Sequence, residues 1–216
     1  MKPLFISATG TGVGKSYTTQ KLLQSLHQSG RKPLALKPIE TGANPTPEDA
    51  LLHLQLMQKL QLDQGLSLEE ICLEHYKLPA SPWVSAKKEG RCVDVDHLLK
   101  RLLEFQKRSD PLLIEGAGGL LVPLLKEYFM IDLAEALEAH VVLVISGKLG
   151  GINEALLSLE ALKHRQMSYT LVLNLWEEEK KSFEEISAPY WEERPERLFR
   201  LDGELEELTQ TLLSAI

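Results

Sequence analysis

The chain has few cysteines, no excess of positive charge and no long hydrophobic run, and each absence excludes a class of protein. The two cysteines lie far apart with no Cys-x-x-Cys pair, which argues against a disulfide framework and against a zinc site. The formal net charge of −7 argues against nonspecific attraction to DNA or to an anionic membrane surface, although it leaves room for a local anion site. These absences favour a protein of a reducing compartment.

Hydrophobic runs are short along the whole sequence. The run near the N-terminus is too short for the core of a signal peptide, and no stretch approaches the ~18 apolar residues of a membrane span. There is no internal repeat and no linker of low complexity. We therefore expect a cytoplasmic protein that forms a single domain over residues 1–216, with neither a membrane nor a nucleic acid as partner.

Short apolar runs alternate with helical patterns. The runs resemble strands that are buried on both faces of a parallel sheet, and they lie at residues 4–7, 34–37, 112–116, 141–146, 170–175 and 197–201. Amphipathic patterns occupy residues 15–28, 49–62, 94–108, 150–165 and 203–216. This alternation predicts an α/β fold with a doubly wound, mainly parallel sheet flanked by helices, and sites at the carboxyl ends of the strands. The charged segment 176–196 reads as a solvated helix and loop.

A glycine-rich loop joins the first strand to the first helix. From Ala8 to Ser16 it reads Ala-Thr-Gly-Thr-Gly-Val-Gly-Lys-Ser, whereas the common phosphate-binding pattern places a glycine at the position of Thr9. The glycines let successive N–H groups converge on phosphate oxygens, and the helix N-terminus adds partial positive charge. In such a loop Lys15 would reach the β- and γ-phosphates, and the Ser16 hydroxyl would bind Mg²⁺. The loop predicts a nucleotide site of altered glycine spacing.

Three charged residues lie where strands end or helices begin. Lys37 ends an apolar run and precedes a proline, so it is suited to hold an anion or to stabilise charge in phosphoryl transfer, although an edge lysine that reaches solvent would look the same. Glu115 ends another run before Gly-Ala-Gly-Gly, the place of a metal-binding carboxylate in phosphate-loop proteins. Asp49 opens a helix, where metal binding and N-capping look alike. With Ser16, these carboxylates predict an oxygen-liganded Mg²⁺ site.

A second glycine-rich turn follows the run at residues 141–146. The amides of Gly150, Gly151, Ile152 and Asn153 predict an anion seat that is better suited to a carboxylate than to a second nucleotide. A plain helix entry is the alternative.

In this order the segments resemble the dethiobiotin synthetase family, which has the P-loop NTPase type of fold. The matching stretches are ATGTGVGKS, KPIETG, EDALLHLQ, EGAGG and GKLGGIN, which span residues 6 to about 160. The resemblance implies an ATP- and Mg²⁺-dependent ligase of biotin biosynthesis. It would use 7,8-diaminopelargonate and CO₂ or bicarbonate, and form dethiobiotin through a carbamate and a carbamic-phosphoric anhydride. It also implies a homodimer whose substrate site is shared across subunits.

The resemblance assigns roles to individual residues. Those expected to act in catalysis are Thr11, Lys15, Lys37 and Thr41. Those expected to bind the nucleotide are Gly10, Thr11, Gly12, Val13, Gly14, Lys15, Ser16, Tyr17, Glu115, Gly116, Gly118 and Asn174. Those expected to bind the substrate are Lys37, Thr41, Gly150, Gly151, Ile152 and Asn153, and those expected to bind the metal are Ser16, Asp49 and Glu115.

The chain departs from the family pattern in two regions. Ala8 replaces the first glycine of the loop, a change compatible with a negative φ, while Gly10 and Gly12 replace an Asp and a Glu. The family's Gly-x-(Ile/Leu)-Pro segment near the base has no match in ERLFRLDGELEE, so the choice between ATP and other nucleoside triphosphates stays open.

Two other functions remain as alternatives. A ParA- or MinD-like ATPase switch would carry its signature lysine at the position of Gly10 and, where it binds membrane, a basic C-terminal helix. The C-terminal segment here is acidic. A catalytically weak binding homologue is the other alternative.

Overall fold

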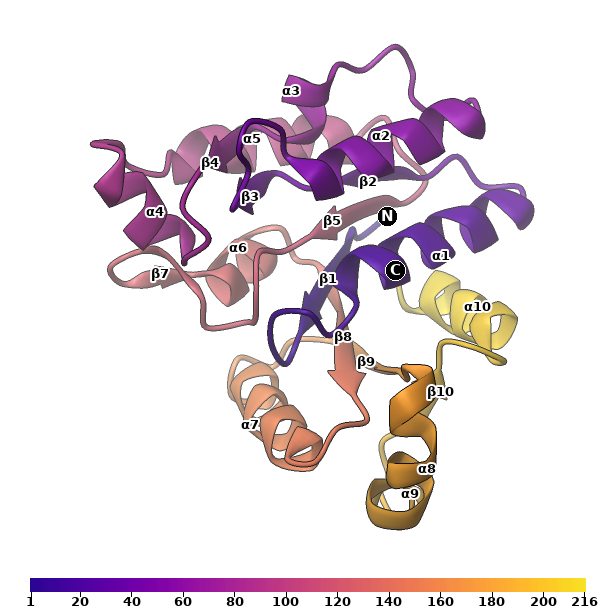
Figure 1. Ribbon diagram of the computed structural model, residues 1–216. Coiled ribbons are helices and arrows are strands. Elements are labelled where there is room, and N and C mark those ends of the chain that lie inside the picture. Colours follow the sequence, from indigo (N-terminus) through magenta and orange to yellow (C-terminus); the bar gives the residue numbers. More distant parts are fainter.

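A six-stranded parallel sheet forms the centre of the computed structural model, which describes residues 1–216 (Figure 1). Its strand order is β10-β9-β8-β1-β5-β2. The strands are β1 (Leu4–Ala8), β2 (Leu34–Leu36), β5 (Leu112–Glu115), β8 (His140–Ser146), β9 (Tyr169–Asn174) and β10 (Leu198–Arg200). Each coincides with one of the apolar runs, so the predicted α/β fold with a mainly parallel sheet is confirmed.

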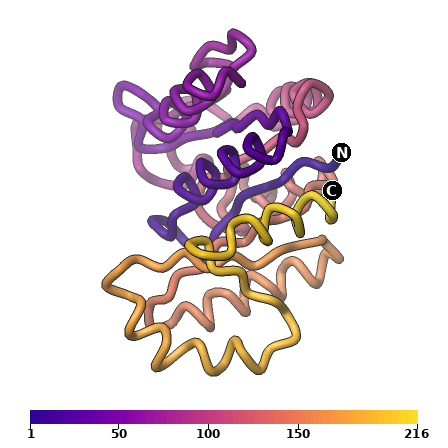
Figure 2. The backbone as a smooth tube through the Cα atoms, turned by 90° about the vertical axis from the view of Figure 1, so that its right-hand side faces the viewer, coloured from indigo at the N-terminus to yellow at the C-terminus, as the bar shows by residue number.

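Helices cover both faces of the sheet, as the parallel connections require. The long ones are α1 (Lys15–Gln28), α2 (Glu48–Lys59), α5 (Val95–Gln106), α7 (Gly151–His164) and α10 (Leu205–Ala215). Figure 2 shows α10 beside α1, where the Ser25 and Thr209 hydroxyls lie 2.7 Å apart. The last helix thus packs against the first one. None of the helices is both long and apolar enough to traverse a bilayer.

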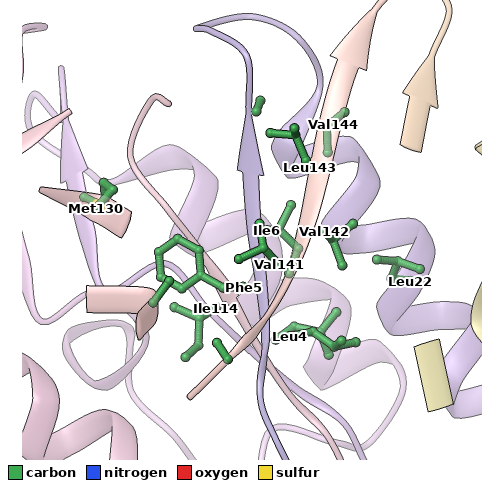
Figure 3. Close-up of a cluster of buried hydrophobic side chains, with 14 of the residues drawn as sticks. Leu4, Phe5, Ile6, Leu22, Ile114, Met130, Val141, Val142, Leu143 and Val144 are labelled. Atoms are coloured by element: carbon green, nitrogen blue, oxygen red, sulfur yellow. The ribbon is translucent and has the colours of Figure 1, made fainter. Parts of the chain in front are cut away.

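The core explains why the strand sequences are continuously apolar. Leu4, Phe5 and Ile6 of β1 are fully buried, and so is the run from Val141 to Val144 in β8 (Figure 3). In the parallel ladder Ile6 is paired with Val142 on one side and with Glu115 on the other. Because the strands are parallel, their carboxyl ends share one edge of the sheet, and the loops that follow them meet there.

Smaller elements branch from this framework. Two are two-stranded sheets, a parallel one of β3 (Ile39–Thr41) and β4 (Glu74–Tyr76) and an antiparallel one of β6 (Pro123–Leu125) and β7 (Tyr128–Phe129). The short helices are α3 (Leu68–Ile71), α4 (Pro82–Lys88) and α6 (Met130–Ala136). The sequence patterns are too short to predict these elements.

The charged segment 176–196 is more closely packed than its sequence predicts. It forms four short helical turns, η1 (Glu177–Glu179), α8 (Lys180–Ser182), η2 (Phe183–Ser187) and α9 (Ala188–Glu192). Phe183, Ala188 and Trp191 belong to the hydrophobic core, so the expectation of a solvated segment is wrong for these side chains. The many charges cover their outer surface and mask the few apolar residues in the pattern.

Candidate active site

The glycine-rich loop curls back over the start of α1. Gly14 is the N-cap residue and has a φ of 104°, and Gly12 has a φ of 74°, both in the left-handed region that favours glycine. Gly10 and Ala8 have no such requirement, so Ala8 takes the place of a family glycine without strain. The Lys15 ammonium donates to the Gly10 carbonyl over 3.0 Å, which places its charge inside the loop.

Asn174, at the end of β9, fastens this loop to the sheet. Its side-chain amide donates to the Val13 carbonyl over 3.0 Å. A Cβ on Gly14 would come within 2.2 Å of the same amide nitrogen. Glycine is therefore required here both by the close approach of Asn174 and by the backbone angle. Val13 and Asn174 are buried, and both therefore support the loop from behind.

A cluster of charged groups lies beneath the loop. One carboxylate oxygen of Glu115, Oε1, accepts hydrogen bonds from Ser16 Oγ over 2.9 Å and from Lys37 Nζ over 2.5 Å. Lys37 also donates to the Gly116 carbonyl over 3.2 Å and lies 3.5 Å from Asp49 Oδ2. The Lys37 side chain is only 5% exposed, so the alternative of an edge lysine reaching solvent is wrong. Its charge lies between two carboxylates.

Burial and pairing set the ionisation of this cluster. Burial opposes the charge on Lys37, but Glu115 and Asp49 outweigh it and raise the pKa of Lys37. Burial likewise opposes the charge on Glu115, but Lys37 and His53 hold the pKa of that carboxyl well below its usual range. Lys15 has less compensation, and burial together with the nearby Lys37 lowers its pKa to about 8. The site is therefore set up to receive negative charge at Lys15.

Asp49 does not cap α2. Pro47 occupies the N-cap position, and no side chain there accepts a hydrogen bond. The first amides of the helix are instead bound by Glu40, which accepts from the N–H of Asp49 over 3.1 Å and from that of Ala50 over 3.0 Å. The capping interpretation of Asp49 is therefore wrong, and its carboxylate is free to face Lys37.

His53 joins the cluster from the same helix. It lies one turn after Asp49, and its Nε2 is 2.7 Å from the second carboxylate oxygen of Glu115. The side chain is fully buried. In the sequence, His53 is a polar residue at an apolar position of the helix, and this pattern alone does not predict that it binds Glu115.

A cavity of about 420 Å³ opens over the cluster. It brings together most of the predicted site residues, namely Thr11, Gly12, Gly14, Lys15, Ser16, Tyr17, Lys37, Thr41, Asp49, Glu115 and Gly118. Trp176 and Glu40, which the sequence does not single out, also line it. A second hollow of about 320 Å³ shares Thr11, Thr41 and Gly118 with this cavity and extends to Ser81 at the start of α4. The two hollows offer adjoining places for two reactants.

The turn at residues 150–153 lies outside both hollows. Gly150 has a φ of 90°, and the Gly151 amide donates to the Lys148 carbonyl over 2.9 Å. A Cβ on Gly151 would lie 2.6 Å from the Ser146 carbonyl oxygen. The expectation that the Gly151 amide is exposed to an anion is therefore wrong, since that residue serves the turn and its packing. The amides of Ile152 and Asn153 make no backbone hydrogen bond.

Comparison with known proteins decides the family. A family model described as "AAA domain" matches residues 2–206. The ATP-dependent dethiobiotin synthetase of Wolinella succinogenes is 97% identical over 216 residues, which cover all of both chains. The enzyme of the same name from a Sulfurovum species is 41% identical over 193 residues, or 89% of this chain and 90% of its own. The chain belongs to the dethiobiotin synthetase family. The resemblance drawn from the five motifs is thereby confirmed, together with the ligase activity that the family name describes.

Solved structures place this dethiobiotin synthetase family member in a wider fold group. The MinC:MinD cell division complex of Aquifex aeolicus matches with a TM-score of 0.56 at 16% identity, over 98% of this chain and 86% of that one. A plasmid partition protein from Borrelia burgdorferi matches with a TM-score of 0.53 at 15% identity, over 100% and 98% of the two chains. At these identities the likeness shows the fold alone. Because the relatives of high identity are synthetases, the ATPase switch is not the favoured function.

Proposed function

We propose that the chain converts 7,8-diaminopelargonate and CO₂ into dethiobiotin with cleavage of ATP to ADP and phosphate. The observation that carries the proposal is the convergence of Lys15, Lys37, Asp49 and Glu115 on one cavity beneath the glycine-rich loop. Although these residues are far apart in the sequence, they form a charge arrangement suited to phosphoryl transfer, beside an adjoining hollow for the diamine.

The nucleotide phosphates would lie on the loop. The amides around Gly12 and Gly14 and the N-terminus of α1 provide donors for phosphate oxygens. Lys15 would leave the Gly10 carbonyl to bind the phosphates. Its buried ammonium, which few negative groups compensate in the protein alone, would then gain an anionic partner. Tyr17 lies at the same cavity, with its ring centroid 6.2 Å from that of Trp176, and together they offer a surface for the rest of the nucleotide.

Mg²⁺ fits the oxygen donors of the site. No group of three or more His, Cys, Asp or Glu side chains is placed to hold a metal alone, but Ser16 and Glu115 are already hydrogen bonded and Asp49 faces the same space. The Lys37 ammonium between the two carboxylates indicates that this space accepts a cation. We assign Ser16, Asp49 and Glu115 to the metal, whose chemistry would be to neutralise phosphate charge.

The reaction needs positioning and charge compensation more than a protein nucleophile. One amine attacks CO₂ and loses a proton to give a carbamate. A carbamate oxygen then attacks the γ-phosphorus, the bond to ADP breaks, and a carbamic-phosphoric anhydride results. The second amine attacks the anhydride carbon, so that phosphate leaves and the ureido ring closes.

The side chains would act at successive stages of this sequence. Lys37 would neutralise the carbamate and the anhydride, and Lys15 would stabilise the transferring phosphoryl group. Thr11 and Thr41, which line both hollows, would donate hydroxyl hydrogen bonds to the phosphate and to the carbamate. Gly118, in the loop after Glu115, lines both hollows and would let the backbone lie close to the ligands. Gly116 lines neither hollow, and its carbonyl accepts from Lys37.

A second copy of the chain would complete the substrate site. The amides of Ile152 and Asn153 make no backbone hydrogen bond and do not line the hollow that contains Thr41, which supports a role for them toward a substrate carboxylate held by a partner subunit. Leu121, Leu149 and Leu157 are between 60% and 81% exposed, and the first and third of them line an apolar hollow of about 370 Å³. Such a surface supports a homodimer. We also propose that residues 1–216 form a single cytoplasmic domain.

The transfer of carbon tests this function. Incubation with ¹³C-bicarbonate, ATP, Mg²⁺ and the diamine should place the label in the carbonyl of a cyclic urea, detected by NMR. Lys37→Met should abolish incorporation because the carbamate loses its counter-ion, while Lys59→Met, on the exposed face of α2, should leave it unchanged. Incorporation by the Lys37 variant at the normal rate would refute its role.

A further inference from the structure

The buried face of α2 contains one side chain that packing alone does not explain. Ala50, His53, Leu54 and Met57 follow the spacing of a helix face against the core, and three of the four are apolar. His53 is completely buried at a position where a leucine would fill the space. Burying an imidazole is costly unless it is hydrogen bonded, so its partner identifies its purpose.

That partner is the second carboxylate oxygen of Glu115. His53 Nε2 lies 2.7 Å from Oε2, while Oε1 accepts from Ser16 and Lys37. An ionised carboxylate only accepts, so Nε2 carries a proton and donates it. The other ring nitrogen, Nδ1, has no partner. One hydrogen bond therefore accounts for all of the polar contact that His53 makes.

The bond fixes the rotation of the Glu115 carboxyl group. With a donor at each oxygen, the carboxylate cannot turn Oε2 toward the cavity without losing the bond to His53. Glu40 holds the N-terminus of the same helix, which presents Asp49 to Lys37 and, one turn later, His53 to Glu115. A single helix thus places one carboxylate directly and orients another.

We propose that His53 is a positioning residue that holds Oε1 of Glu115 toward the metal and the reacting phosphate. The proposal rests on the function proposed above for Ser16, Asp49 and Glu115 as metal ligands. Hydrogen bonds of this kind to metal ligands typically change metal affinity or activity by about 10- to 100-fold when removed.

Metal affinity, measured without turnover, tests the proposal. Mn²⁺ would be titrated by electron paramagnetic resonance into the protein bound to a non-hydrolysable ATP analogue. His53→Leu removes the donor at similar volume and should weaken Mn²⁺ binding about 10- to 100-fold. His53→Gln keeps an N–H donor near the position of Nε2 and should restore most of the affinity. Wild-type affinity in the leucine variant, or equal losses in both variants, would overturn the proposal.

A third variant separates this proposal from the function on which it rests. Glu115→Gln should itself weaken Mn²⁺ binding. If it does not, the metal site is misassigned; if it does while His53→Leu binds normally, only the role of His53 is refuted.

A measurement on the unaltered protein guards against variants that fail to fold. The ¹⁵N chemical shifts of the His53 ring should show a proton on Nε2. A proton on Nδ1 alone would leave no donor for Glu115 and would refute the proposal.

Discussion

Lys37 carries both stability and chemistry, because its charge and that of Glu115 are buried together. The two side chains are 5% and 0% exposed, and their charged atoms are 2.5 Å apart. Breaking a buried ion pair by removing one partner costs more than the pair contributes, because the remaining charge is left in a poor solvent. A substitution of Lys37 or Glu115 therefore changes stability as well as chemistry, and the activity of such a variant is interpreted together with its stability.

We predict that Lys37→Met lowers the free energy of unfolding by about 3 kcal/mol, since Glu115 keeps only the hydrogen bonds from Ser16 and His53. Adding Glu115→Gln removes the stranded charge and should recover most of the stability, without recovering activity. Urea denaturation of the wild type, the single variants and the double variant measures this. A double variant no more stable than Lys37→Met would contradict the pairing.

The sequence predicts residues that belong to recognisable motifs and misses those that serve them. Lys15, Lys37 and Glu115 stand at strand ends or in a glycine-rich loop, where their chemistry can be read from position. Glu40 and His53 act through hydrogen bonds to groups 9 to 62 positions away in the chain. No local pattern encodes such contacts, because they depend on how α2 lies relative to Glu40 of β3 and Glu115 of β5.

Among the elements, α2 shows how capping and chemistry are divided between two carboxylates. Glu40 binds the first amides of the helix, and Asp49 faces Lys37. We predict that Glu40→Ala costs about 1 kcal/mol of stability, a typical loss for a helix cap. Asp49→Asn should cost less stability, but it should weaken Mg²⁺ binding and so raise the Mg²⁺ concentration needed for half-maximal activity. Thermal unfolding and the Mg²⁺ concentration for half-maximal activity separate the two. A larger stability loss in the Asp49 variant would contradict this division.

The strands of the central sheet and the long helices were accessible from sequence, and the smaller elements around them were not. A continuous apolar run, or an amphipathic pattern of ten or more residues, indicates directly which side chains are buried. The six strands of the central sheet and the five long helices could therefore be predicted. The β3–β4 and β6–β7 pairs lie outside the central sheet, and their strands are only two or three residues long. The turns between Glu177 and Glu192 depend on a few buried side chains within a charged background.

For the whole molecule, one buried histidine in β8 links stability to pH. His140 lies 2.8 Å from the Thr170 hydroxyl, and burial, assisted by the charge of Lys2, lowers its pKa from 6.5 to about 4. Between these values the unfolded chain binds a proton that the folded protein does not. Stability should therefore fall as the pH falls from 6.5 to 4, with a contribution from His140 on the order of 3 kcal/mol.

Urea denaturation across this range, with His140→Gln as the reference, measures the contribution. The stability curves of the two proteins should converge or cross toward pH 4, because the variant lacks the titrating group. Parallel curves would exclude His140 as the source.

The central claim concerns the whole assembly of loop, charged cluster and adjoining hollow. Its most direct test is the release of phosphate from ATP with bicarbonate and Mg²⁺, with and without 7,8-diaminopelargonate, and with a monoamine analogue as control. We predict that phosphate release requires the diamine and equals the dethiobiotin formed, and that the monoamine does not support ring closure. Equal rates of phosphate release with and without the diamine would contradict the account.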